Sequence, residues 1–279
     1  MTINILPLDE LVQNYLEWLK NIKHAPYQTF RAYQVDLLQF LKYFLRIEKN
    51  DLPSKNEMDE YLYTMKEKYN YASYRRKITV LRNFTKYLIE TGINVPDHFI
   101  SISLPMPEVN FNLPIKYEEI LSLIDSLPEN NLQEIRDKLI FSLIAKSGLT
   151  IKQLLSLKIK DINLANRQII VSRNQLTFID DKTVMLMEIF FSKINEKSPI
   201  ALEDYLISGM PRHATTLGKL PLSTRSINLI IDKTSSENGF KTRLSPTILR
   251  RLFAKSLTEK NINKSVKEMI FGKKCRLVG

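Results

Sequence analysis

The sequence is poor in the residues on which several classes of functional site depend. Among 279 residues it has one cysteine, three histidines and seven glycines. A single cysteine rules out an internal disulfide and a cysteine-based zinc site, and three scattered histidines disfavour a metal enzyme. Neither the glycine pattern of a dinucleotide-binding fold nor that of a P-loop occurs. We therefore expect neither a metal nor a cofactor.

Long hydrophobic runs are missing as well. No apolar stretch approaches the roughly 18 residues that mark a transmembrane helix. Residues 1–5 place no basic residue ahead of their apolar ones, unlike the start of a signal peptide. We expect a protein of a reducing compartment, the cytoplasm, without a membrane partner.

Acidic residues are too few to balance the basic ones, since 41 Lys and Arg face 30 Asp and Glu, a formal charge of +11. Residues 1–105 carry a net charge of +2, residues 106–239 carry none, and residues 240–279 carry +9. This concentration predicts a polyanionic partner, of which nucleic acid is the commonest. A solvated basic face or a frayed tail would give the same count.

Apolar residues recur at helical spacing through the first third of the chain and predict a bundle of four short helices. The first helix carries Leu11, Tyr15, Trp18, Leu19 and Ile22 on one face. The second begins near Thr29 and carries Val35, Leu38, Leu41 and Leu45. The third follows Ser54 and Glu57, a capping-box pair. The fourth covers about residues 73–90 and stops before Gly92.

Four prolines within residues 96–114 then predict a linker, and a second domain begins near residue 115. Its helices are expected at residues 117–126, 132–146, 151–157, 181–193, 223–234 and 247–260, with Asp180 capping the fourth of them. Residues 167–171 and 176–179 flank Asn174-Gln175 and predict a short β-hairpin. The second domain is thus expected to be mainly helical with one small sheet.

Sequence motifs follow one another in a set order from about residue 9 to 273, through both predicted domains. In the first third they are Thr29-x-x-x-Tyr33-x-x-Asp36-Leu37 and Ser73-Tyr74-Arg75-Arg76-Lys77-Ile78. Beyond residue 114 they are Arg136-Asp137-Lys138, Ser147-Gly148-Leu149, Gly218-Lys219-Leu220-Pro221 and Leu244-Ser245-Pro246-x-x-Leu249-Arg250. In this order they resemble the tyrosine recombinases, the phage-integrase and Xer group.

The resemblance implies a mainly α fold in two domains. A four-helix, SAM-like core-binding domain would cover residues 1–105, a proline-rich linker residues 106–114, and an α+β catalytic-like domain with a small sheet residues 115–279. It also implies double-stranded DNA as the partner and no metal. In this family a tyrosine attacks the scissile phosphodiester, two arginines hold the phosphate, a hairpin lysine protonates the leaving oxygen, and a histidine or tryptophan assists.

Most of these catalytic positions depart from the family pattern. Thr150 stands where the first arginine is expected, and Gln153 replaces an acidic residue. The hairpin lysine falls within Arg173-Asn174-Gln175. Thr247 replaces the histidine of the His-x-x-Arg box, whereas Arg250 matches its arginine. Arg250 is therefore the one catalytic position that the resemblance carries over.

The end of the sequence departs too. Lys273 follows Gly272 where the family has histidine or tryptophan, and the chain ends at Gly279 with its last tyrosine at Tyr205. We expect the nucleophile to be absent and the catalytic-like domain to be truncated. Cys275 as a replacement nucleophile is disfavoured, because a lone cysteine near a terminus is usually incidental.

The resemblance also places basic residues at the DNA. The residues expected to contact it are Arg31, Arg75, Arg76, Lys77, Arg82, Lys219, Arg250 and Arg251. The alternative for each is a solvated helix face or an ion pair within the protein. A further cluster, either a DNA-binding tail or a disordered remnant, comprises Lys264, Lys267, Lys273, Lys274 and Arg276.

These observations predict a DNA-binding homologue of site-specific recombinases and integrases, associated with the nucleoid, that has lost strand cleavage. Two alternatives stay open. One is a divergent active recombinase with a partner-supplied tyrosine or a rebuilt site, in which Lys146 or Lys152 replaces the first arginine and Lys273 the histidine or tryptophan that follows the glycine. The other is an accessory protein that docks on a complete recombinase. A homo-oligomer is also a candidate assembly.

Overall fold

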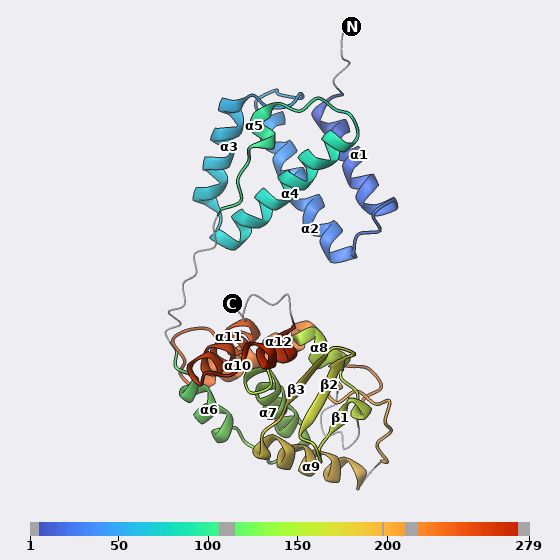
Figure 1. Ribbon diagram of the computed structural model, residues 1–279, viewed down its shortest axis with the longest axis vertical. Helices are drawn as coiled ribbons and strands as arrows, with labels where there is room; N and C mark the ends of the chain where they lie inside the picture. The colour runs from blue at the N-terminus through green and yellow to red at the C-terminus, as the bar shows by residue number, and fades with distance from the viewer. Residues whose placement is uncertain (1–5, 106–114, 197, 210–216, 273–279) are drawn as a thin grey trace. The chain divides into compact units, whose positions relative to one another are not determined.

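The structure, a computed structural model, describes residues 6–105, 115–196, 198–209 and 217–272. The chain divides into two compact units, Met1–Val109 and Asn110–Gly279 (Figure 1). The predicted linker, residues 106–114, lies outside the described residues, so its boundaries stay a prediction. Across the described ranges, no helix is long and apolar enough to cross a membrane.

The N-terminal unit is helical, as predicted. Its helices are α1 (Leu8–Asn21), α2 (Tyr27–Leu45), α3 (Lys55–Lys68), α4 (Tyr71–Glu90) and α5 (Asp97–Ile100). The short α5 was not foreseen. The capping box at the start of α3 is confirmed, because the Ser54 and Glu57 side chains each accept a hydrogen bond from the other residue's backbone amide. α4 begins two residues earlier than expected because Asn70 caps it.

The buried face of α2 differs from the expected one. Val35, Leu38 and Leu45 are exposed by 41–46 %. The side that packs into the core instead carries Asp36, Leu37, Phe40, Leu41 and Phe44. The aromatic rings of this side bury more apolar area than the predicted stripe. The correct face was not recognised in the sequence because it includes Asp36, and a carboxylate is rarely buried unless it is paired.

The C-terminal unit is built around α7 (Leu132–Ala145), nearly all of whose residues from Ile135 onward are buried. α7 packs against α6 (Tyr117–Ser126), α8 (Ile151–Ser156), α9 (Asp181–Asn195), α10 (Thr224–Glu237) and α11 (Pro246–Glu259). The last described helix is α12 (Lys264–Phe271). The predicted helices are confirmed to within a few residues. α12 was not predicted, because its basic residues indicated a tail.

One antiparallel sheet completes this unit, in the order β1-β2-β3. The predicted hairpin corresponds to β2 (Gln168–Ser172) and β3 (Gln175–Phe178), in which Ile169 pairs with Thr177. A third strand, β1 (Ile162–Asn163), follows a 3-10 turn at Ile159–Asp161 and pairs with β2. α12 packs against β3, which brings the last described helix to the hairpin (Figure 1).

Candidate functional site

The turn between α7 and α8 forms the floor of the candidate site. Gly148 has a φ of 69°, and a Cβ atom there would lie 2.7 Å from the Phe271 ring and 3.1 Å from the Phe253 ring. A side chain is therefore excluded by both backbone conformation and space. The close approach brings α7, α11 and α12 together at one point.

Arg250 of α11 is held at this turn. Its Nε donates to the carbonyl oxygen of Gly148 at 2.7 Å, and its guanidinium lies 5.6 Å from the centre of the Phe271 ring. The side chain is half-buried. The matched arginine thus sits beside Gly148, in an orientation fixed by a backbone carbonyl and an aromatic ring.

Thr150, at the expected position of the first arginine, caps α8. Its hydroxyl accepts from the Gln153 backbone amide at 3.2 Å, and the Gln153 Oε1 accepts from the Thr150 backbone amide at 2.9 Å. The two side chains also bond each other at 2.9 Å. This is a complete capping box. The residue that replaces the arginine therefore has a defined structural task.

Gln153 extends the contact to the hairpin and to α12. Its Nε2 donates to Gln175 Oε1 at 3.0 Å, and Gln175 Nε2 donates to the Ile270 carbonyl at 2.6 Å. We call Thr150, Gln153, Gln175 and the Ile270 carbonyl the amide chain. It includes the positions where the resemblance expects an arginine and an acid, and one residue of the window 173–175 where it expects a lysine. None of its side chains is charged.

The other polar groups around the turn serve the fold. Thr177 of β3 is fully buried and donates to the Ser147 carbonyl at 2.6 Å. Lys146 pairs with Asp180 at 3.0 Å, and Asp180 caps α9 through the Thr183 amide. Burial alone would raise the pKa of Asp180, but hydrogen bonds from Thr183 and Lys146 outweigh it and lower the pKa.

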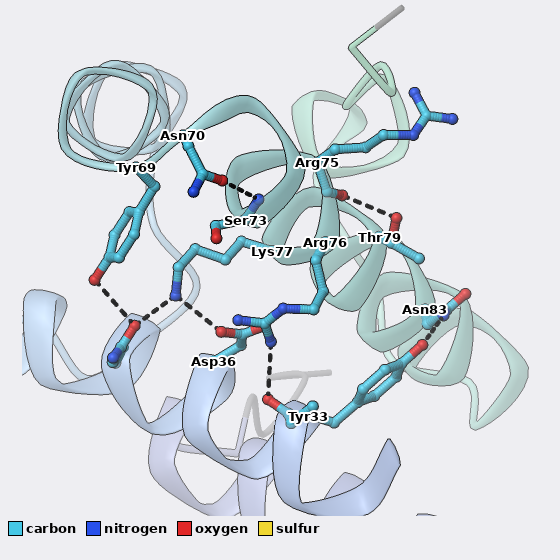
Figure 2. A network of polar contacts seen from close by, with 12 residues as sticks. Tyr33, Asp36, Tyr69, Asn70, Ser73, Arg75, Arg76, Lys77, Thr79 and Asn83 are labelled. Atoms are coloured by element: carbon cyan, nitrogen blue, oxygen red, sulfur yellow. Dashed lines mark hydrogen bonds and ion pairs between the residues drawn. The ribbon is translucent and has the colours of Figure 1, made fainter. Parts of the chain in front are cut away.

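A second polar network lies in the N-terminal unit. Asp36 of α2 is 3 % exposed and accepts from two consecutive residues of α4, Arg76 and Lys77 (Figure 2). Lys77 also bonds the Gln39 side chain and lies 4.4 Å from the centre of the Tyr69 ring. We call these five residues the Asp36 network.

The basic residues predicted to contact DNA fall into three groups: those bonded within the N-terminal unit, Arg250 at the turn, and those that are simply exposed. Arg75 is half-buried and donates to the Pro105 carbonyl, Arg76 belongs to the Asp36 network, and Lys77 is buried at 3 % exposure instead of lying on the helix surface. Arg250 is held at Gly148. The exposed remainder comprises Arg31, Arg82, Lys219 and Arg251.

Comparison with known proteins decides the family. Residues 115–274 match the phage integrase family, and residues 12–92 match the N-terminal SAM-like domain of phage integrases. The chain belongs to the phage integrase family. The resemblance drawn from the ordered motifs is confirmed, together with the mainly helical fold and its small sheet.

Relatives within this family are similar over nearly their whole length. A tyrosine recombinase of Pseudothermotoga lettingae is 26 % identical over 280 residues, covering 95 % of this chain and 90 % of the relative. The tyrosine recombinase XerC of Lactobacillus delbrueckii subsp. bulgaricus is 25 % identical over 272 residues, covering 93 % and 89 %. The chain is thus a tyrosine recombinase homologue.

Solved integrase structures share the fold. The Tn1549 transposon integrase, determined with transposon right end DNA, superposes with a TM-score of 0.70 at 15 % identity, covering 97 % of this chain and 92 % of that one. Lambda integrase bound to DNA gives 0.67 at 17 % identity, covering 98 % and 94 %. At such low identity the likeness concerns the fold alone.

Lys146 and Lys152 are the candidate substitutes for the arginine that the family resemblance expects at position 150 of this phage integrase homologue. The Lys146 side chain is 9 % exposed and paired with Asp180, so it stabilises the fold. Lys152 is exposed on α8. Thr247 is exposed in the first turn of α11. Lys273, Lys274, Cys275 and Arg276 lie outside the described residues.

The basic C-terminal cluster is part of the fold as far as residue 272. Lys264 is exposed at the start of α12, whereas Lys267 is 9 % exposed and donates to the Thr258 hydroxyl at 3.3 Å. Residues 264–271 are therefore a helix and not a disordered remnant, whereas a contact of these lysines with DNA stays a prediction. The charge pattern misled because the apolar residues that anchor α12, Ile270 and Phe271, come only at its end.

Sequence reasoning missed two features of this integrase homologue. It gave Asp36 no role, although a carboxylate inside an apolar helix pattern signals a paired cation. It read Gln153 and Gln175 only as absences of family residues. Their mutual contact joins positions 22 residues apart and has no local signal.

Proposed function

We propose that this phage integrase homologue binds duplex DNA in site-specific recombination or integration and does not itself cleave or join strands. The observation that carries the proposal is the amide chain. Thr150 stands where the first arginine is expected and Gln175 belongs to the window 173–175 where the lysine is expected, and both are engaged in hydrogen bonds with Gln153.

Charge explains why this exchange matters for catalysis. Phosphoryl transfer builds negative charge on the phosphate oxygens, which preorganised cationic donors stabilise. The loss of one such donor costs about 100- to 1000-fold in rate. Within the window 173–175, neither Gln175 nor Arg173 can donate a proton to the leaving oxygen as a lysine can, since an arginine does not give up its proton near neutral pH. Arg250 alone leaves the transition state without its second clamp and its acid.

Binding survives these exchanges because it depends on other residues. Phosphate contacts come from exposed cations and need no preorganised acid. We assign such contacts to Arg31, Arg75, Arg76, Arg82, Lys219, Arg250 and Arg251, and we assign Lys77 to the Asp36 network behind them. The integrases of similar fold that were solved with DNA support duplex binding by this fold.

Salt dependence tests the binding half of the proposal. If the protein makes 6–10 phosphate contacts, its affinity for a duplex falls about 1000-fold or more between 50 and 200 mM salt. Arg251→Ala should lower the slope by about one contact, whereas Asn238→Ala, away from these cations in the sequence, should leave it unchanged. A flat salt response in a gel-shift titration contradicts duplex binding through phosphates.

Strand joining tests the catalytic half without requiring a tyrosine from this chain. A nicked duplex carries a 3′-phosphotyrosine beside a free 5′-hydroxyl. The hydroxyl oxygen attacks phosphorus, the tyrosine leaves with the proton, and the strand is sealed. We expect binding with no joining above the background rate, whereas a complete tyrosine recombinase joins the nick. Joining that Arg250→Ala abolishes would contradict the proposal.

A further inference from the structure

The Asp36 network brings two cations from consecutive residues to one buried carboxylate. Lys77 Nζ lies 2.8 Å from Asp36 Oδ1, and an Arg76 amino group bonds Asp36 Oδ2. The same Arg76 nitrogen also reaches the Ala32 carbonyl at 3.4 Å (Figure 2). One negative and two positive charges leave the network with a net charge of +1.

The two cations are not equivalent. The Lys77 side chain is 4 % exposed, and its ammonium group is occupied by Asp36, Gln39 and the Tyr69 ring. The Arg76 side chain is 43 % exposed. A guanidinium has five donors in a fixed plane, and the contacts of Arg76 with Asp36 and Ala32 use one of its amino groups. A side chain this exposed has donors left for a further acceptor.

We propose that Asp36 is a positioning residue, which fixes Arg76 so that the remaining donors of its guanidinium bond a DNA phosphate, while Lys77 balances the carboxylate. This inference rests on the proposed DNA binding. A long side chain loses rotamer freedom when it binds, and a side chain already held in place avoids that loss. With Lys77 as its counter-charge, Asp36 can orient Arg76 without cancelling its charge.

When the Asp36 carboxylate is removed, the position of Arg76 and the net charge of the network predict opposite changes in the affinity for DNA. By charge alone, loss of an aspartate near DNA strengthens binding to a polyanion. By position, the same loss weakens binding, because Arg76 is no longer fixed. A variant of unchanged net charge separates the two effects, and Asp36→Asn with Lys77→Met is such a variant. Replacing a buried ion pair by uncharged groups of similar size is often tolerated.

The experiment is a double-mutant cycle on duplex affinity, measured by salt titration of the full chain. Arg76→Ala should weaken binding about tenfold in the native background, as for the loss of one charge-assisted hydrogen bond. It should also lower the salt slope by about one contact. In the Asp36→Asn/Lys77→Met background it should weaken binding less than about twofold. Lys66→Ala on α3, also the loss of one exposed charge, serves as the control and should cost the same in both backgrounds.

An equal cost of Arg76→Ala in both backgrounds overturns the positioning role while leaving DNA binding intact. A wild-type chain that binds no duplex overturns the proposed function itself, and the inference with it. If the double variant does not fold, Arg76→Lys decides. Lysine keeps the charge but lacks the planar fork, so it should bind about as weakly as Arg76→Ala. Native affinity in Arg76→Lys would overturn the proposal.

Discussion

Two polar networks join distant parts of the sequence in this protein, and they differ in charge. In the N-terminal unit, Asp36 ties α2 to α4 through two cations. In the C-terminal unit, the amide chain ties α8, β3 and α12 through uncharged groups. The Asp36 network, where we propose a contact with DNA, is thus charged. The amide chain, where strand cleavage would need cations, is uncharged.

The contrast also has an energetic side. A buried carboxylate must be paired, and the removal of one partner leaves an uncompensated charge. An amide that loses its partner leaves only an unsatisfied dipole, which costs less. The first network should therefore be harder to break than the second. Three substitutions in the networks and one at the turn beside the amide chain follow, from the largest expected effect to the smallest.

Asp36→Ala leaves the buried Lys77 ammonium without its carboxylate. We expect the free energy of unfolding to fall by about 3–5 kcal/mol, as for other broken buried pairs. Urea denaturation measures the change. The control is Asp51→Ala, which removes an exposed ion pair with Lys49 and should cost less than about 1 kcal/mol. Equal losses in the two variants would show that the Asp36 network does not stabilise the unit.

Gly148→Ala tests the floor of the candidate site. The added Cβ meets the Phe271 and Phe253 rings at a positive φ, so strain and overpacking together should cost about 2–4 kcal/mol. Gly239→Ala is the matched control, because Gly239 has a φ of 72° with nothing within 4 Å. It should cost only the strain, about 1–2 kcal/mol. If the two variants melt alike, the contact between this turn and α12 is not as close as described.

Gln175→Leu breaks the centre of the amide chain. It leaves the Gln153 amide without its acceptor and frees the Ile270 carbonyl. We expect a loss of about 1–3 kcal/mol in the free energy of unfolding. Gln168→Leu, on the neighbouring strand β2 and outside the amide chain, is the control. A loss larger than that of Asp36→Ala would reverse the proposed order of the two networks.

Thr150→Ala removes only the cap of α8. The expected cost is about 1 kcal/mol, typical of a lost helix cap. Thr150→Ser keeps the hydroxyl and should restore most of the stability. Thermal melting compares the two variants. If serine fails to restore the loss, the threonine acts through its methyl group and the capping box is not its main role.

Local patterns predicted much of this fold. Helix caps such as Ser54 and Asp180 have short-range sequence signals, and the structure confirms both. The end of α7 before Gly148 was also predicted from its glycine. These features depend on residues close together in the chain, which is why the sequence reveals them.

Long-range pairing was harder to predict. The buried face predicted for α2 was wrong because Asp36, on the face that is actually buried, is balanced by cations 40 and 41 residues away. α12 was missed because its basic residues are supported by contacts with other elements, such as that between Lys267 and Thr258. A glutamine carries no sign of its partner, so the amide chain could be found only in the structure.

The most direct test of the central claim is the strand-joining assay on a nicked duplex with a 3′-phosphotyrosine. It measures binding on a native gel and sealing on a denaturing gel from the same reaction. We predict a saturable, salt-sensitive complex and no sealed strand above background. A sealed strand that appears with the wild-type chain and disappears with Arg250→Ala would show that the candidate site still performs phosphoryl transfer, and would contradict the account.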